Sequence, residues 1–189
     1  MQTLFTTTNE AEFAQHLEAG YCFGMSCDWA QKSLKSQRGQ GVKYKDQLEE
    51  FKWVIGQTAY ETNKGVTDQG LISGMGLNVQ GHYSGAIASW GALCNFMYNT
   101  AGLGTFLFCI DGPGGGHAMG YRRVKMTDVL GRSKDSLQWL DPNIGLMDFS
   151  NMGDFTTNVS AKLDELYGSG ESDPNERLDQ NYELFKVTV

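Results

Sequence analysis

Apolar side chains recur every three or four residues in several stretches of the chain, which is the period of an amphipathic helix. This spacing predicts helices over about 10–18, 22–36, 46–63, 84–99 and 154–167. In the second of these, Phe23, Cys27 and Ala30 share one face, and Met25 and Trp29 share another. Because apolar side chains occur on more than one face, we expect this helix to be mostly buried.

A different pattern begins near residue 105, where short β-prone apolar runs alternate with turn-forming residues. It predicts strands over about 105–110, 117–125, 136–141, 145–149 and 181–189. The glycine- and proline-rich turn 111–116 joins the first two as an antiparallel hairpin. Residues 64–82 are predicted to form a long loop, and 125–136 an excursion between strands. Helices followed by strands indicate an α+β fold, with N-terminal helices packed on a C-terminal antiparallel sheet.

Composition narrows the class of protein. The 189 residues are predicted to form one domain, 1–189, and the net charge of −7 argues against a nucleic-acid or anionic-membrane surface. No apolar run approaches the roughly 18 residues of a membrane span, and the N-terminus lacks the pattern of a Sec signal peptide. The four cysteines form no CxxC pair, so we expect reduced thiols, no metal site and no cofactor.

The residues around the predicted hairpin suggest a general base. His117 opens the second strand of the hairpin, and Asp141 ends the following strand, where the next residue, a proline, keeps it extended. A histidine at one strand end beside a carboxylate at another is the arrangement of an oriented base. Asn143 and Asp111 are alternative orienting residues. His82 is an alternative base, although its predicted position in a loop before a helix suits a surface residue better.

Cys22 is the candidate nucleophile. It lies in the predicted first turn of helix 22–36, where free backbone N–H groups and the helix dipole favour a thiolate. Cys27 lies a turn and a half further along and is expected to face the core. The pattern alone fits a nucleophile and a small buried apolar residue equally well.

A catalytic thiol also needs donors for the oxyanion that forms on the substrate. One is the backbone N–H of Cys22, and the other is expected to be a side chain upstream of it. Gln15 is the nearest amide, and Asn9 and Gln2 are alternatives.

Three segments together resemble the YopT/AvrPphB-type cysteine peptidases, which are papain-like bacterial effectors. Residues 22–29 resemble the nucleophile helix of that family, 116–121 its histidine strand and 140–145 its aspartate turn. The order of Cys, His and Asp along the chain is also the same. The resemblance implies a papain-like fold with Cys22 as nucleophile, His117 as general base and Asp141 as the residue that orients it. This chain departs from the family in the long gap between His117 and Asp141.

The resemblance further implies a cysteine protease that acts on a protein substrate through a thioester. We expect a secreted bacterial effector or toxin that modifies a host protein in a target cell, or a cytoplasmic enzyme if the chain is not exported. A glutamine deamidase or transglutaminase-like effector with the same triad is one alternative, and an inactive binding module of the same fold is another. An extended cleft through Cys22 would favour the protease, and a short pit the deamidase. We expect Asp141→Ala to lower activity with little loss of folding.

Overall fold

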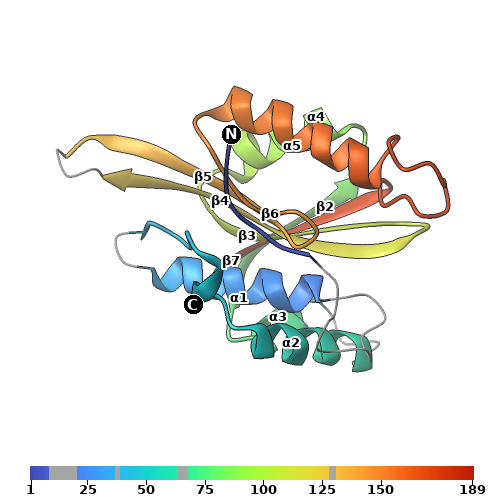
Figure 1. Cartoon of the computed structure of the whole chain (residues 1–189), viewed down its shortest axis with the longest axis horizontal. Coiled ribbons are helices and arrows are strands. Elements are labelled where there is room, and N and C mark those ends of the chain that lie inside the picture. Colours follow the sequence, from blue (N-terminus) through green and yellow to red (C-terminus); the bar gives the residue numbers. More distant parts are fainter. Residues whose placement is uncertain (9–20, 37–38, 64–67, 128–130) are drawn as a thin grey trace.

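The computed structural model describes residues 1–8, 21–36, 39–63, 68–127 and 131–189. An antiparallel sheet forms the middle layer, and helices cover both of its faces (Figure 1). The elements in chain order are β1 (Gln2–Thr6), α1 (Cys22–Lys35), the 3₁₀ segment η2 (Lys45–Gln47), α2 (Glu50–Thr62), α3 (Asp68–Gly74), β2 (Asn78–Ala86), α4 (Trp90–Phe96), the π-helical segment η3 (Met97–Ala101), β3 (Gly104–Gly112), β4 (Gly115–Thr127), β5 (Ser133–Asp141), β6 (Gly145–Phe149), α5 (Met152–Tyr167) and β7 (Asn181–Thr188). The predicted α+β class is therefore confirmed.

The seven strands of the described chain lie in the order β1-β6-β5-β4-β3-β7-β2. Helices α1, α2 and α3 lie on one face of this sheet, and α4 and α5 lie on the other (Figure 1). Alternate residues of each strand serve the two faces. In β3, Leu107 packs with the α1 side, whereas Phe106 and Phe108 pack with α4 and α5. The sheet thus separates two hydrophobic cores.

Helix α1 is held close to both of its neighbours. A Cβ on Gly24 would lie 2.1 Å from a backbone oxygen of α2, so the two helices pack backbone to backbone. Gly120 of β4 leaves room for the ring of Trp29, which a Cβ there would approach to 2.3 Å. Ser26 Oγ donates to the carbonyl oxygen of Ala118 at 3.0 Å. These contacts fix the N-terminal half of α1 against β4.

Most of the predicted elements are present. The helices 22–36 and 154–167 correspond to α1 and α5, and the five predicted strands correspond to β3, β4, β5, β6 and β7. The predicted helix 46–63 is present from Glu50 as α2, after the separate segment η2. The predicted helix 10–18 lies outside the described residues.

Three predictions made from local pattern were wrong. The predicted loop 64–82 contains α3 and the start of β2, and the predicted helix 84–99 begins only at Trp90. Residues 125–127 and 133–136 do not loop out, because they remain paired as parts of β4 and β5. Strand β2 was missed because it is an exposed edge strand, and its partner β7 lies about a hundred residues further along the chain. Its glycine-rich and polar sequence therefore has little apolar alternation to reveal it.

Candidate active site

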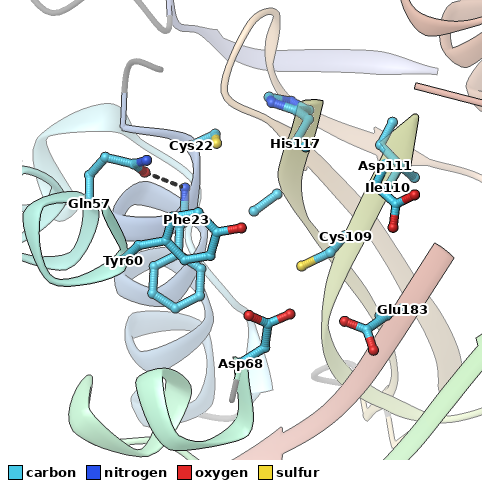
Figure 2. A pocket seen from close by; sticks show the side chains of 12 residues that line it. Cys22, Phe23, Gln57, Tyr60, Asp68, Cys109, Ile110, Asp111, His117 and Glu183 are labelled. Atoms are coloured by element: carbon cyan, nitrogen blue, oxygen red, sulfur yellow. Dashed lines mark hydrogen bonds between the residues drawn. The ribbon is translucent and has the colours of Figure 1, made fainter. Parts of the chain in front are cut away.

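The structure brings Cys22, His117 and Asp141 together from three different elements. Cys22 is the first residue of α1, His117 lies near the start of β4, and Asp141 ends β5. His117 Nε2 lies 2.9 Å from Asp141 Oδ1. The side chains of Cys22 and His117 also share a hydrogen bond, and they lie at the same end of a pocket (Figure 2). Since Nε2 faces Asp141, Nδ1 is the ring nitrogen that remains for the thiol.

Strand register explains how a histidine and an aspartate far apart in sequence come to lie side by side. The last paired residues of β4 and β5 at this end are Gly120 and Leu140. β4 begins before this pair, so His117 lies beside the end of β5, where Asp141 is placed. Helix α1 supplies Cys22 from the face of the sheet that it covers.

The electrostatics of the three groups favour a charged pair. Cys22, His117 and Asp141 are only 5%, 6% and 0% exposed. Burial alone would raise the pKa of the Cys22 thiol, but the hydrogen bond and charge of His117, with backbone hydrogen bonds from Ala118 and Phe23, lower that pKa overall. Burial would also lower the pKa of His117, yet Asp141 and Cys22 together raise it to about 10. Both shifts favour a thiolate–imidazolium pair over a neutral thiol beside a neutral imidazole.

The other three cysteines differ from Cys22. Burial, with neighbouring negative charge for the first two, raises the pKa of the Cys27 and Cys109 thiols, and burial alone raises that of Cys94 to about 12. Cys27 is fully buried in the core, as its place on the helix predicts. Among the four thiols, only Cys22 has a lowered pKa.

The carboxylate of Asp141 is held by more donors than the sequence suggests. Asn143 donates its backbone N–H to Oδ1 at 2.9 Å. The Tyr167 hydroxyl lies 2.9 Å from Oδ2 and 3.0 Å from Oδ1. Asn143 Nδ2 donates to that hydroxyl oxygen at 2.8 Å, so the single phenolic proton is directed at Asp141. Asn143 thus supports Asp141 rather than bonding His117.

Tyr167 is a buried partner of Asp141 and His117 that sequence reasoning missed. It is the last residue of α5, one position beyond the predicted apolar residues of that helix, and its ring lies 5.0 Å from the ring of His117. The only available signal was that a buried tyrosine normally finds a partner for its hydroxyl. Nothing in the local pattern names Asp141 as that partner.

We expect Tyr167→Phe to lower kcat about tenfold with KM nearly unchanged, the effect of losing one hydrogen bond to a charged group. The phenyl ring would keep its packing against His117, while Asp141 would lose a donor. Steady-state kinetics on a peptide substrate would measure this. Tyr98→Phe is the matched control, because Tyr98 lies on η3 beside Arg123. A variant with full kcat and only a lower melting temperature would show that Tyr167 has a structural role alone.

The remaining candidates from the sequence lie elsewhere. Asp111 accepts a hydrogen bond from Asn181 at 2.9 Å. His82 lies on β2 rather than in a loop, with Nε2 3.2 Å from Glu183 Oε1 and its ring stacked on Phe185. In the described chain neither residue forms a hydrogen bond with Cys22 or His117, so neither orients the imidazole or contacts the thiol.

The side-chain donors predicted for the oxyanion hole stay predictions as far as the described residues go. Gln15 and Asn9 lie outside them, and Gln2 is exposed on β1. A different amide, Gln57 of α2, is buried beside Cys22, and its Oε1 accepts the backbone N–H of Phe23 at 3.1 Å (Figure 2). It was missed because it follows Cys22 in the chain and lies on a helix of its own.

A cavity of about 90 Å³ opens beside the sulfur of Cys22. Its walls come from α1, α2, α3 and the neighbouring strands, and are formed by Cys22, Phe23, Gln57, Tyr60, Asp68, Cys109, Ile110, Asp111, Gly116, His117, Ala118 and Glu183. Within the described ranges, no group of three or more His, Cys, Asp or Glu side chains is placed to hold a metal ion. In the same residues, no helix is long and apolar enough to cross a membrane.

No protein-family model and no curated protein matches the chain. Its fold is similar to the crystal structure of the Pseudomonas avirulence protein AvrPphB, with a TM-score of 0.62 and 14% sequence identity. The match covers 91% of this chain and 93% of the AvrPphB chain. At this level of identity the similarity is one of fold. AvrPphB is one of the two proteins after which the family that the three motifs resemble is named.

Proposed function

We propose that this protein is a papain-like cysteine peptidase that cleaves a protein substrate through Cys22, His117 and Asp141. The observation that carries the proposal is the buried chain of contacts from the Cys22 thiol through His117 to the Asp141 carboxylate. The same residues are those that the family resemblance implies. The fold similarity to AvrPphB over nearly the whole chain supports the same conclusion.

The geometry supports a two-stage reaction. The Cys22 thiolate attacks the carbonyl carbon of the scissile bond, and the oxyanion is stabilised by the backbone N–H of Cys22 together with a second donor. The His117 imidazolium then gives its proton to the leaving amine, and a thioester remains on Cys22. His117, now neutral, takes a proton from water, whose oxygen attacks the thioester. The carboxylate product leaves and the thiolate–imidazolium pair is restored.

The biological setting follows from the same resemblance. We propose a secreted bacterial effector that acts on a host protein inside a target cell. The fold similarity to an avirulence protein supports this setting. Mass spectrometry of host-cell extracts, before and after addition of the protein, would identify the cleaved protein by its new termini.

A glutamine deamidase is the second candidate, and the small size of the cavity is the observation that favours it. A cavity of about 90 Å³ beside Cys22 has room for one side chain rather than for an extended peptide. A side-chain amide entering it would meet the same thiolate. The same mass-spectrometric experiment separates the two reactions, because a deamidase would increase the mass of a glutamine by about one dalton, as replacement of NH₂ by OH requires, without cutting the chain.

The thiolate at Cys22 predicts selective alkylation. With iodoacetamide at near-neutral pH, we expect Cys22 to react at least about tenfold faster than Cys27, Cys94 and Cys109, because its pKa is lowered while theirs are raised. Peptide mapping after short exposure would measure the four rates. Cys22→Ala should remove the fast reaction, and Cys27→Ala should leave it in place. Equal rates at all four thiols would rule out the proposed nucleophile.

A further inference from the structure

The cavity beside Cys22 carries a feature that peptide hydrolysis alone does not require. Its far end, away from Cys22 and His117, is formed by the carboxylates of Asp68 and Glu183, which are turned toward one another (Figure 2). Asp68 begins α3 and Glu183 lies on β7, so two distant segments bring these groups to one place. The hollow therefore runs from a reactive sulfur to a pair of acids.

The charges at that end are only partly compensated. Asp68 and Glu183 share a hydrogen bond, and burial together with Asp68 raises the pKa of the Glu183 carboxyl. Two carboxylates this close repel one another when both are ionised. No lysine or arginine is among the described residues that line the cavity, and His82 Nε2 lies 3.2 Å from Glu183 Oε1. A cation placed between the two acids would relieve the repulsion.

The walls between the two ends suit an aliphatic chain. The ring of Tyr60 stacks on that of Phe23, with centroids 5.1 Å apart, and both rings line the cavity. Burial first of all raises the pKa of Tyr60 to about 12, so its hydroxyl stays neutral. A long side chain with methylene groups along its length and a cationic head would place apolar atoms against the rings and its charge at the acids.

We propose that this cavity, defined by Cys22 at one end and by Asp68 and Glu183 at the other, is a specificity pocket for a lysine or arginine side chain of the substrate. The pocket rests on the proposed function, because it selects a residue beside the bond that Cys22 attacks. Its volume of about 90 Å³ suits a single side chain. An acidic side chain would be repelled from the pocket, and an uncharged side chain would not relieve the repulsion between the two carboxylates.

Peptidyl chloromethyl ketones test the pocket without the need to know the natural substrate. The Cys22 thiolate displaces chloride from such a reagent, so the rate of alkylation reports how well the attached peptide binds. We would compare reagents that carry lysine or its uncharged isostere norleucine at the first or second residue from the ketone. Each rate is divided by the iodoacetamide rate of the same protein. At one of the two positions, we expect lysine to react about tenfold faster than norleucine, as one well-placed charge pair provides.

The double variant Asp68→Asn, Glu183→Gln should abolish the lysine preference, because it removes both charges and keeps the shape. Glu165→Gln is the matched control, since that exposed carboxylate of α5 lies outside the cavity, and it should keep the preference. Norleucine reacting as fast as lysine at both positions would overturn the pocket while the peptidase proposal stands. If iodoacetamide does not single out Cys22, the proposed function fails and the pocket fails with it.

Discussion

His117→Ala is expected to lower kcat/KM for a peptide or protein substrate about 10³-fold, within the range that a positioned acid–base group contributes. His117 supplies both the hydrogen bond and the charge that lower the pKa of Cys22 against the effect of its burial. Without the imidazole, burial dominates, the pKa of the thiol rises, and the leaving amine has no proton donor. The rate of Cys22 alkylation, measured against pH, should therefore move to higher pH in the variant.

Two measurements separate this chemical effect from a loss of structure. Added imidazole should restore part of the activity, because removing the ring leaves a space that opens to the cavity beside Cys22. The circular dichroism spectrum should match that of the unaltered protein. A catalytic imidazole contributes at least about a hundredfold to the rate. A variant that keeps activity within a factor of about two of the original would therefore exclude His117 as the base.

The local elements that carry the three candidate residues can be predicted from the sequence, because each depends on residues that are close together in the chain. The first turn of α1, the hairpin that carries His117 and the turn after Asp141 are each set by neighbouring residues. Turn-forming glycines and prolines, and the helical repeat of apolar side chains, can be recognised within a window of about 18 residues. Local pattern does not show which of these elements lie together in space. For Cys22, His117 and Asp141 the family resemblance implied that they do, and it implied this for no other residue.

Long-range contacts account for what was missed. Tyr167 reaches Asp141 from the end of α5, Gln57 reaches Phe23 from α2, and β2 pairs with β7. Each contact joins segments whose separation in sequence gives no local pattern. The acidic end of the cavity is of the same kind, since Asp68 lies in a stretch predicted to be a loop and Glu183 in a strand predicted for its bulky residues.

The position of α1 links the fold to the proposed chemistry. The contacts of Gly24 with α2 and of Trp29 with Gly120 leave no space for a larger residue, so the helix cannot shift far along β4. Ser26 bonds the carbonyl of Ala118, the residue next to His117. Close packing of this kind is how an active site holds reacting groups to within a fraction of an ångström. The distance between thiol and imidazole is thus set by core residues that take no part in the reaction.

Asp141 is expected to affect both stability and activity, because its carboxylate is fully buried and accepts from three groups. Asp141→Ala would leave His117 Nε2–H, the Asn143 N–H and the Tyr167 hydroxyl without their acceptor. Each buried donor left unpaired costs about 1–3 kcal/mol, so we expect a loss of about 3 kcal/mol in the free energy of unfolding. From the sequence alone we expected little loss of folding in this variant; the buried contacts of Asp141 lead us to expect a clear loss of stability instead. kcat/KM should fall about 10³-fold, since His117 loses its orientation.

Asp141→Asn separates the charge of this residue from its hydrogen bonding. The amide oxygen can still accept from His117, so this variant should be more active than Asp141→Ala. The charge of Asp141 is the largest influence that raises the pKa of His117 to about 10, and its removal lowers that pKa. The imidazolium exists only below its pKa, so the alkaline limb of the pH–rate profile should move to lower pH. Asp148→Asn, a half-buried carboxylate on β6, is the control and should leave the limb in place. An unmoved limb in Asp141→Asn would mean that Asp141 does not set the protonation of His117, and the mechanism would lose its third member.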